Sequence, residues 1–161
     1  MTHFYYYYPT PTGDMTVTEN GHAITGISFG RQQVKNAEYQ QTPLLKMAGQ
    51  ELAEYFAGRR YEFDLPFEFE IGSDFQQRVW QALFTVPYGQ TASYKEIAER
   101  INMPKAVRAV GGALHKNPIA ICVPCHRVIR SNGHLSGYAG GLDRKQHLLD
   151  LEKHIHCCDP K

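Results

Sequence analysis

A cysteine and a histidine stand side by side in the segment Pro124-Cys125-His126-Arg127-Val128. The thiolate, rather than the thiol, is the nucleophile of cysteine chemistry, and a nearby imidazole together with the charge of Arg127 would favour the ionised form. Neighbours on an extended strand point to opposite faces, so the two side chains can cooperate only if the chain turns at Pro124. The pair predicts a cysteine nucleophile, although most cysteines are inert apolar side chains.

The residues just before this pair, Ile119 to Val123, form an apolar run that predicts a buried strand. Cys122 and Cys125 also match C-x-x-C, the spacing of redox motifs and of half a zinc site. A redox motif usually opens a helix, whereas this one closes the predicted strand. A zinc site would need further ligands, which the tail could supply from His154, His156, Cys157 and Cys158.

Positive charge is concentrated around the cysteine, although the net charge of the chain is only +1. Residues 1–87 hold six basic and ten acidic side chains, whereas residues 88–145 hold nine basic and three acidic ones. Such a basic segment suits a polyanionic partner such as nucleic acid, and an ordinary solvated face is the alternative.

The bulk composition limits the class of protein. A chain of 161 residues with 42% apolar content can build one compact domain or two small lobes. Its four cysteines all lie in the last quarter, which does not suit a disulfide framework. No apolar run approaches the ~20 residues of a membrane span, and the first residues lack the regions of a signal peptide. We therefore expect a cytoplasmic protein with no membrane partner.

The first 72 residues predict an antiparallel scaffold lobe. Aromatic and β-branched runs separated by Gly and Asn turns indicate strands over Phe4 to Tyr8, Met15 to Thr18, Ile24 to Phe29 and Tyr61 to Phe69. An amphipathic helix opens at Thr42-Pro43 and is stopped by Gly58.

Residues 73–154 predict a helical domain, and residues 155–161 a flexible tail. Two capping boxes, Ser73-Asp74-Phe75-Gln76 and Ser93-Tyr94-Lys95-Glu96, each begin a helix. A tight turn then leads to a third helix from Lys105 to about His115, which makes a helix-turn-helix candidate. Gly111 and Gly112 inside that helix cost about 1 kcal/mol each relative to alanine. Either core packing or close approach to a DNA backbone would explain them.

Together these motifs resemble the O6-alkylguanine-DNA alkyltransferases. The resemblance runs in order from about Phe75 to Glu152 and rests on four motifs: Arg108-Ala109-Val110-Gly111-Gly112, Asn117-Pro118, Pro-Cys-His-Arg-Val at 124–128 and Tyr138-Ala139-Gly140-Gly141-Leu142. It implies an α+β fold with a ribonuclease H-like amino-terminal lobe and a winged helix-turn-helix-like carboxyl-terminal lobe. It also implies that Cys125 takes the alkyl group from O6 of guanine, or less readily O4 of thymine, and stays alkylated.

The resemblance further implies a role for each site residue. His126 would accept the thiol proton through a water, while Glu152 orients the imidazole and Asn117 holds the turn. Tyr94 would donate to guanine N3. The lesion would leave the duplex through the minor groove, and Arg108 would fill the vacated space.

Further residues follow from the same matching. The DNA-binding surface would include Lys105, Arg108, Ala109, Gly111, Gly112 and Arg127. The pocket would be lined by Leu114, Ala120, Val128, Tyr138, Ala139, Gly140 and Lys145. The carbonyls of Cys125 and Val128 would bind the guanine amino group, and Lys145 could assist the thiol unless it is simply solvated.

Two departures from the family pattern bear on these expectations. Ala139 replaces a serine of some members, so only its backbone could donate to O6. The zinc ligands that some members carry in the amino-terminal lobe are not evident, so we expect no structural zinc and no cofactor. The resemblance also implies a monomer whose partner is double-stranded DNA carrying O6-alkylguanine. Three alternatives remain: a lesion binder without transfer activity, a hydrolase using Cys125, His126 and Glu152, and a transcription regulator.

Overall fold

The computed structural model describes residues 2–133, 138 and 140–158, without the side chains of 154–158. These residues form two compact units. The first consists of Met1–Glu70 and Pro118–Cys122, and the second of Ile71–Asn117 and Val123–Lys161. The segment Pro118–Cys122 thus belongs with the amino-terminal unit, whereas the sequence had assigned it to the second domain.

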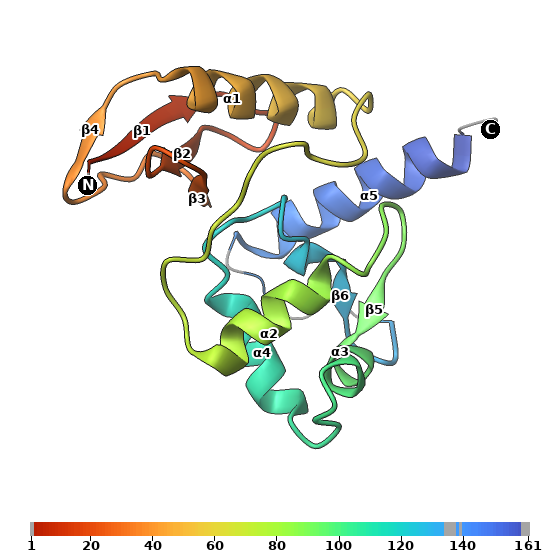
Figure 1. Cartoon of the computed structure of the whole chain (residues 1–161). Coiled ribbons are helices and arrows are strands. Elements are labelled where there is room, and N and C mark those ends of the chain that lie inside the picture. Colours follow the sequence, from red (N-terminus) through yellow and green to blue (C-terminus); the bar gives the residue numbers. More distant parts are fainter. Residues whose placement is uncertain (1, 134–137, 139, 159–161) are drawn as a thin grey trace. The chain divides into compact units, whose positions relative to one another are not determined.

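A four-stranded sheet forms the first unit, in the order β3-β2-β1-β4 (Figure 1). Strands β1 (His3–Tyr8), β2 (Met15–Glu19) and β3 (Ile24–Phe29) form the predicted antiparallel meander. Strand β4 (Ala37–Tyr39) was not predicted and pairs parallel with β1. Three residues are too few for an alternation of apolar and polar side chains to be recognised in the sequence. Contact between the Tyr39 and Tyr6 rings, whose centroids are 4.8 Å apart, accompanies the pairing.

The outer edge of β3 receives two segments that were wrongly predicted as strands. Tyr61 to Phe69 contributes one bridge, between Phe67 and Ile24, and Ile119 to Val123 contributes one, between Ile119 and Ile27. The prolines at positions 66 and 118 lack an N–H, so neither segment can continue a ladder at that residue. The second segment then turns at Ile121, whose φ of 70° lies in the left-handed region.

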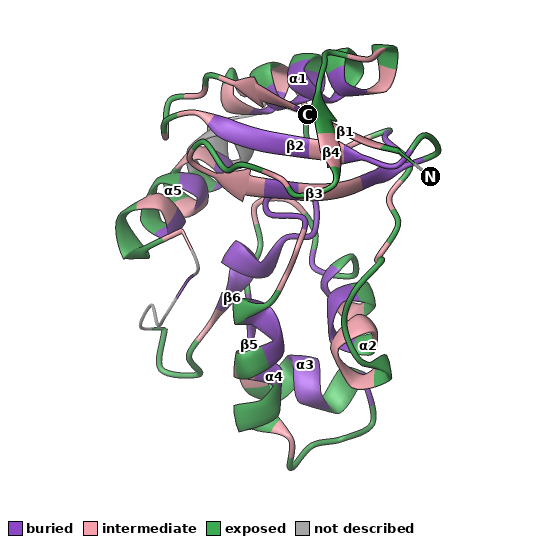
Figure 2. Ribbon diagram, turned by 90° about the vertical axis from the view of Figure 1, so that its left-hand side faces the viewer, coloured by how far each residue is buried: buried purple, intermediate pink, exposed green. Residues whose placement is uncertain are grey.

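Helix α1 (Pro43–Phe56) lies along the sheet and contacts β1 and β2 (Figure 1). Its first turn is capped by Thr42, whose side chain accepts from the Leu45 amide, and Gly58 follows its end with a φ of 76°. A Cβ on Gly49 would overlap the Tyr8 ring, so this glycine permits the helix to approach β1. Figure 2 shows β2 buried along most of its length in this unit.

Three helices form the body of the second unit. Both predicted capping boxes are present, at the start of α2 (Asp74–Leu83) and of α3 (Tyr94–Arg100). Helix α4 (Val107–His115) begins two residues later than predicted. The Trp80 Nε1–H donates to the Ala113 carbonyl at 2.8 Å, which joins α2 to α4 in the interior. The sequence therefore predicted the helix-turn-helix arrangement of α3 and α4 in its main features.

The remaining elements of the second unit surround the Cys125 segment. A short parallel pair joins β5 (Ala92–Ser93) to β6 (Val128–Ile129), and the 3₁₀ turn η1 (Cys125–Arg127) precedes β6. Helix α5 (Leu142–Cys158) contacts η1. This helix includes 155–158, which the sequence had assigned to a flexible tail, and 159–161 lie outside the described residues. In the described part of the chain, no helix is long and apolar enough to cross a membrane.

Candidate active site

The chain turns at Pro124, as cooperation between Cys125 and His126 requires. Pro124 has φ −80° and ψ 62°, and the three residues after it form η1. The amide of Cys125 donates to the Val123 carbonyl at 2.8 Å, and that of Arg127 donates to the Pro124 carbonyl at 3.0 Å. Because these amides are satisfied within the turn, the buried backbone holds Cys125 in a fixed position.

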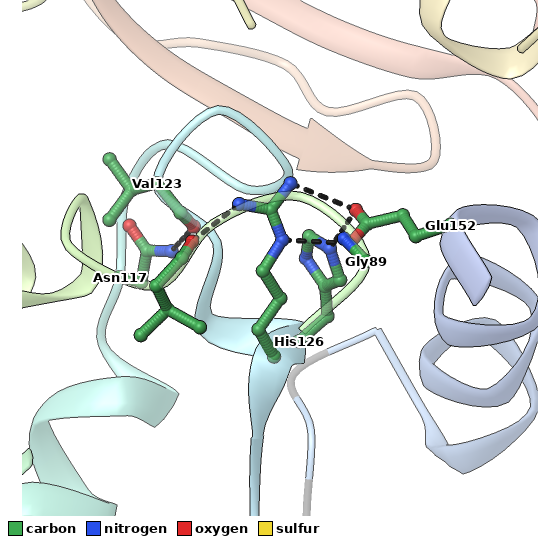
Figure 3. Close-up of polar contacts among 7 residues, drawn as sticks. Gly89, Asn117, Val123, His126 and Glu152 are labelled. Atoms are coloured by element: carbon green, nitrogen blue, oxygen red, sulfur yellow. Dashed lines mark hydrogen bonds and ion pairs between the residues drawn. The ribbon is translucent and has the colours of Figure 1, made fainter. Parts of the chain in front are cut away.

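Asn117 fixes both the turn and the thiol. Its Nδ2 donates to the Val123 carbonyl at 2.9 Å and to Cys125 Sγ at 3.1 Å. Figure 3 shows the Asn117 amide directed at Val123. A donor beside sulfur stabilises the thiolate more than the thiol, so Asn117 orients Cys125 and also favours its ionisation.

His126 and Glu152 form a buried pair. His126 Nε2 lies 2.6 Å from Glu152 Oε2, and the two side chains are 0% and 1% exposed (Figure 3). His126 Nδ1 is also buried and has no hydrogen-bond partner among the described residues. When Nε2–H donates to the carboxylate, Nδ1 is the acceptor nitrogen of the neutral ring. The imidazole therefore presents a base.

Arg127 binds the Glu152 carboxylate as a second partner beside His126. Its Nε lies 2.8 Å from Glu152 Oε1, its Nη2 lies 3.1 Å from Oε2, and its Nη1 donates to the Val86 carbonyl at 2.8 Å. The sequence assigned Arg127 to the DNA-binding surface, whereas in this structure its side chain is buried and paired with Glu152. The guanidinium also lies 5.6 Å from the centre of the Tyr88 ring.

The loop that carries Val86 and Tyr88 was not recognised as part of the site. Besides the Val86 carbonyl, the Gly89 amide faces Glu152 Oε1 at 3.4 Å, as Figure 3 shows. In the sequence, Val86-Pro87-Tyr88-Gly89 indicates only the end of a helix, and its hydrogen bonds to the site come from backbone atoms of Val86 and Gly89. Because every residue type has the same backbone atoms, the sequence carries no signal for such a role.

Burial and neighbouring charges set the protonation states. Burial raises the pKa of Cys125, and the Asn117 hydrogen bond and the charge of Lys145 oppose that shift. Burial lowers the pKa of His126, and Glu152 opposes that shift. Burial would raise the pKa of Glu152, but His126 and Arg127 outweigh it and hold the pKa well below its usual range. At neutral pH the site holds a thiol, a neutral imidazole and a carboxylate.

Lys145 is buried rather than solvated. Its side chain is 1% exposed and Nζ donates to the Val128 carbonyl at 2.6 Å. Burial lowers its pKa to about 8, and the nearby Cys125 opposes that shift. The ammonium is thus charged at neutral pH and acts electrostatically on the thiol.

The comparisons with known proteins agree with this arrangement. Residues 74–154 match the family model described as "6-O-methylguanine DNA methyltransferase, DNA binding domain", and residues 3–69 match its "ribonuclease-like domain". A methylated-DNA–protein-cysteine methyltransferase of Mycobacterium tuberculosis is 48% identical over 147 residues, which cover 89% of this chain and 88% of the relative. The chain belongs to this methyltransferase family.

Two further relatives support the same assignment. The constitutive methylated-DNA–protein-cysteine methyltransferase of Bacillus subtilis is 45% identical, with 89% of this chain and 92% of the relative covered. A crystal structure of Mycobacterium tuberculosis OGT in complex with DNA matches with a TM-score of 0.88 and 45% identity, and covers 94% of each chain. The family resemblance inferred from the sequence is confirmed.

Helix α4 of this methyltransferase family member and the turn before it expose most of the residues assigned to DNA. Lys105, Arg108, Ala109 and Gly112 are exposed. A Cβ on Gly112 would meet no atom within 4 Å, and one on Gly111 would make only an ordinary contact with the Tyr94 ring. Core packing therefore does not explain the glycine pair, and close approach to a DNA backbone stays a prediction.

The residues expected to line the pocket have different surroundings. Leu114, Val128 and Tyr138 are buried in the second unit, and Tyr94 is half-buried at the start of α3. Ala120 belongs to the first unit, where its amide donates to the Ile27 carbonyl. The Gly140 carbonyl accepts from Arg144 at 3.1 Å, and Ala139 lies outside the described residues.

Metal ligands do not gather in the part of the chain whose side chains are described. No three His, Cys, Asp or Glu side chains there are placed to hold one ion. The alternative zinc ligands from His154 to Cys158 lie outside that part. Cys122 and Cys125 are both free thiols.

Proposed function

We propose that the chain repairs DNA by transferring the alkyl group of O6-alkylguanine, and less readily of O4-alkylthymine, to Cys125, once per molecule. Family membership supports the DNA-repair methyltransferase activity, and the relatives carry that activity in their names. The partner is double-stranded DNA that carries the lesion, in keeping with the relative crystallised with DNA.

The chemistry of the transfer suits this site. The sulfur attacks the saturated carbon, a C–S bond forms, and the bond between that carbon and O6 breaks with its electron pair left on the base. The thiol gives up one proton and the departing guanine takes one up, so the reaction balances without an oxidant or reductant. Because the thioether resists hydrolysis by ordinary side chains, the protein is consumed in one turnover.

The buried relay accounts for the ionisation of a thiol whose pKa burial has raised. The thiol proton passes through a bridging water to His126 Nδ1, the ring nitrogen that has no partner among the described residues. Glu152, 2.6 Å from Nε2, then stabilises the imidazolium. Arg127 keeps Glu152 ionised, so the relay is ready at neutral pH.

The lesion reaches the thiol after it rotates out of the duplex. Helix α4 enters the minor groove, where Gly111 and Gly112 permit close approach and Arg108 fills the gap left by the base. Tyr94 donates to guanine N3 and neutralises the departing base. The carbonyls of Cys125 and Val128 accept from its amino group.

One observation carries the proposal: in a methyltransferase family member, the Asn117 amide donates to the buried Cys125 Sγ, and the next residue, His126, is paired with Glu152. A hydrolase would use the nucleophile's own backbone amide for the oxyanion, but that of Cys125 donates to Val123. A lesion binder without transfer activity would have no need of a thiol at this position. The cytoplasmic location and the monomeric state stay predictions.

The experiment is incubation with a duplex that contains a single O6-methylguanine. We expect the intact mass to rise by one methyl group, peptide mapping to place it on Cys125, and the reaction to stop after one equivalent. Multiple turnovers would contradict single use and support a hydrolase. Cys125→Ser should abolish transfer and retain DNA binding.

A further inference from the structure

We propose that the amino group of the lesion base releases Lys145 from the Val128 carbonyl, so that the ammonium then stabilises the Cys125 thiolate. The resting thiol thus remains weakly reactive until a base of the right kind is bound. The inference rests on the proposed function and deepens it, since it makes the 2-amino group of the purine a signal for transfer as well as a binding contact.

The Val128 carbonyl already accepts a hydrogen bond before any base is bound. In the proposed function the Val128 carbonyl accepts from the guanine amino group, yet in this structure it already accepts from Lys145 Nζ at 2.6 Å. Val128 and Lys145 are 0% and 1% exposed, so neither group has bulk water as an alternative partner. A second donor at this carbonyl must share it with a charged one, which weakens the contact of each.

Competition for the Val128 carbonyl changes the ionisation of the neighbouring Cys125 thiol. The charge of Lys145 already lowers the pKa of the thiol, and the thiol in turn opposes the fall in the pKa of Lys145. An ammonium that has lost its carbonyl gains more from a thiolate than from a thiol. Base binding therefore raises the share of thiolate when the alkyl carbon is beside the sulfur.

Lys145 is a positioning residue that neither loses its proton nor forms a bond in this step. The thiol proton still goes to His126, and the sulfur still attacks the alkyl carbon. The titratable groups on which the charge of Lys145 acts are Cys125 and His126 of η1, and it lowers the pKa of both. Among them, the thiol is the group whose ionisation would balance the ammonium.

The test compares two duplexes that differ in one group, O6-methylguanine and O6-methylhypoxanthine, which lacks the 2-amino group. Single-turnover transfer is measured at saturating duplex with the unaltered protein, Lys145→Met, Lys145→Arg and Lys153→Met. The last variant removes an exposed lysine from the same helix. We expect the unaltered protein and Lys153→Met to transfer from O6-methylguanine about tenfold faster, the effect of one hydrogen bond to a charged group.

In Lys145→Met that ratio of transfer rates should fall to about one, because the amino group has no ammonium left to release. Lys145→Arg keeps the charge and should restore part of the ratio. If Lys145→Met slows both duplexes by the same factor, the lysine has only a structural role and the proposal is overturned. If Cys125 of the unaltered protein is methylated by neither duplex, the proposed function itself fails.

A measurement on the unaltered protein keeps the proposal testable even if Lys145→Met does not fold. Raising the pH from 7 to 9 removes the charge of Lys145, whose pKa is about 8. The ratio between the two duplexes should therefore fall with pH toward one. A ratio that is constant over this range would overturn the proposal.

Discussion

Arg127 holds Glu152 by both carboxylate oxygens, with Nε 2.8 Å from Oε1 and Nη2 3.1 Å from Oε2. The same carboxylate binds His126 at 2.6 Å. Glu152 is thus shared between a cation and the proposed base, which limits how strongly it can raise the pKa of His126. The ion pair belongs to the proton relay as much as to the folded core.

Arg127→Ala should therefore change both stability and the pH profile. Removing one partner of a buried pair costs about 3–5 kcal/mol of unfolding free energy. The uncompensated Glu152 would also raise the pKa of His126 and move the acid limb of the transfer rate to higher pH. Denaturant unfolding followed by Trp80 fluorescence and a pH–rate profile measure the two effects.

The matched control is Arg31→Ala, which breaks an exposed ion pair with Asp14 in the first unit. Exposed pairs contribute about 0–1 kcal/mol. If Arg127→Ala were no more destabilising than this control, and its acid limb did not move, the role given to Arg127 would be wrong.

Gly112→Ala should separate stability from DNA binding. The site is exposed and has open space around the new Cβ, so alanine should raise helix stability by about 1 kcal/mol. If DNA approaches α4 here, the same methyl group should weaken binding. Thermal unfolding and fluorescence anisotropy with a lesion duplex give the two readings.

Gly49→Ala in α1 is the contrasting variant, since its Cβ would overlap the Tyr8 ring. It should lose stability without a direct effect on DNA contacts. Equal affinity of Gly112→Ala and the unaltered protein for DNA would show that α4 is not approached closely at that position.

The salt dependence of DNA binding should reflect the basic residues that are not engaged within the protein. Between Tyr88 and Lys145, Arg127 and Lys145 are buried, while Arg100 and Arg144 donate to Thr85 and Gly140. Five exposed cations of this segment have no side-chain hydrogen bond or ion pair within the described part of the chain: Lys95, Lys105, Arg108, Lys116 and Arg130.

Each phosphate contact contributes about 0.9 to the slope of log K against log salt. We therefore expect a slope no steeper than about −4.5, measured by titration between 50 and 200 mM salt. Each exposed cation replaced by alanine should reduce the slope by about one if it contacts a phosphate. A much steeper slope would require contacts from other parts of the chain.

Stability should fall in mild acid because of the buried relay. The pKa values of His126 and Glu152 are both lowered in the folded state, so the unfolded chain binds protons more readily below about pH 6.5 and again below about 4.5. Their contribution is complete above pH 6.5 and is lost as the pH falls. Unfolding free energies measured from pH 7 to 4 should therefore decrease.

His126→Gln removes the first of these groups and should flatten the curve between pH 6.5 and 5. His115→Gln, which replaces an exposed histidine at the end of α4 outside the relay, serves as the control. An unaltered protein with constant stability from pH 7 to 5 would contradict the buried neutral state of His126.

The sequence by itself determined the helices of the second unit, the meander of β1 to β3 and the choice of Cys125 as the candidate nucleophile. Ser73 and Ser93 are local signals, because a capping box needs only residues within one turn. The turn at Pro124 was likewise predictable, since proline restricts its own backbone. The family motif added Asn117 and Glu152, whose connection with Cys125 no local pattern indicates.

Only the tertiary structure decided where Arg127 and Lys145 lie. Both residues look like surface cations in the sequence, and burial of a charge depends on partners from distant segments: Glu152 and the Val86 carbonyl for Arg127, the Val128 carbonyl for Lys145. Likewise, the runs at 61–69 and 119–123 have strand-like composition but find only single bridges on β3. Hydrogen-bond partners across the chain, rather than local propensity, determine whether such segments become strands.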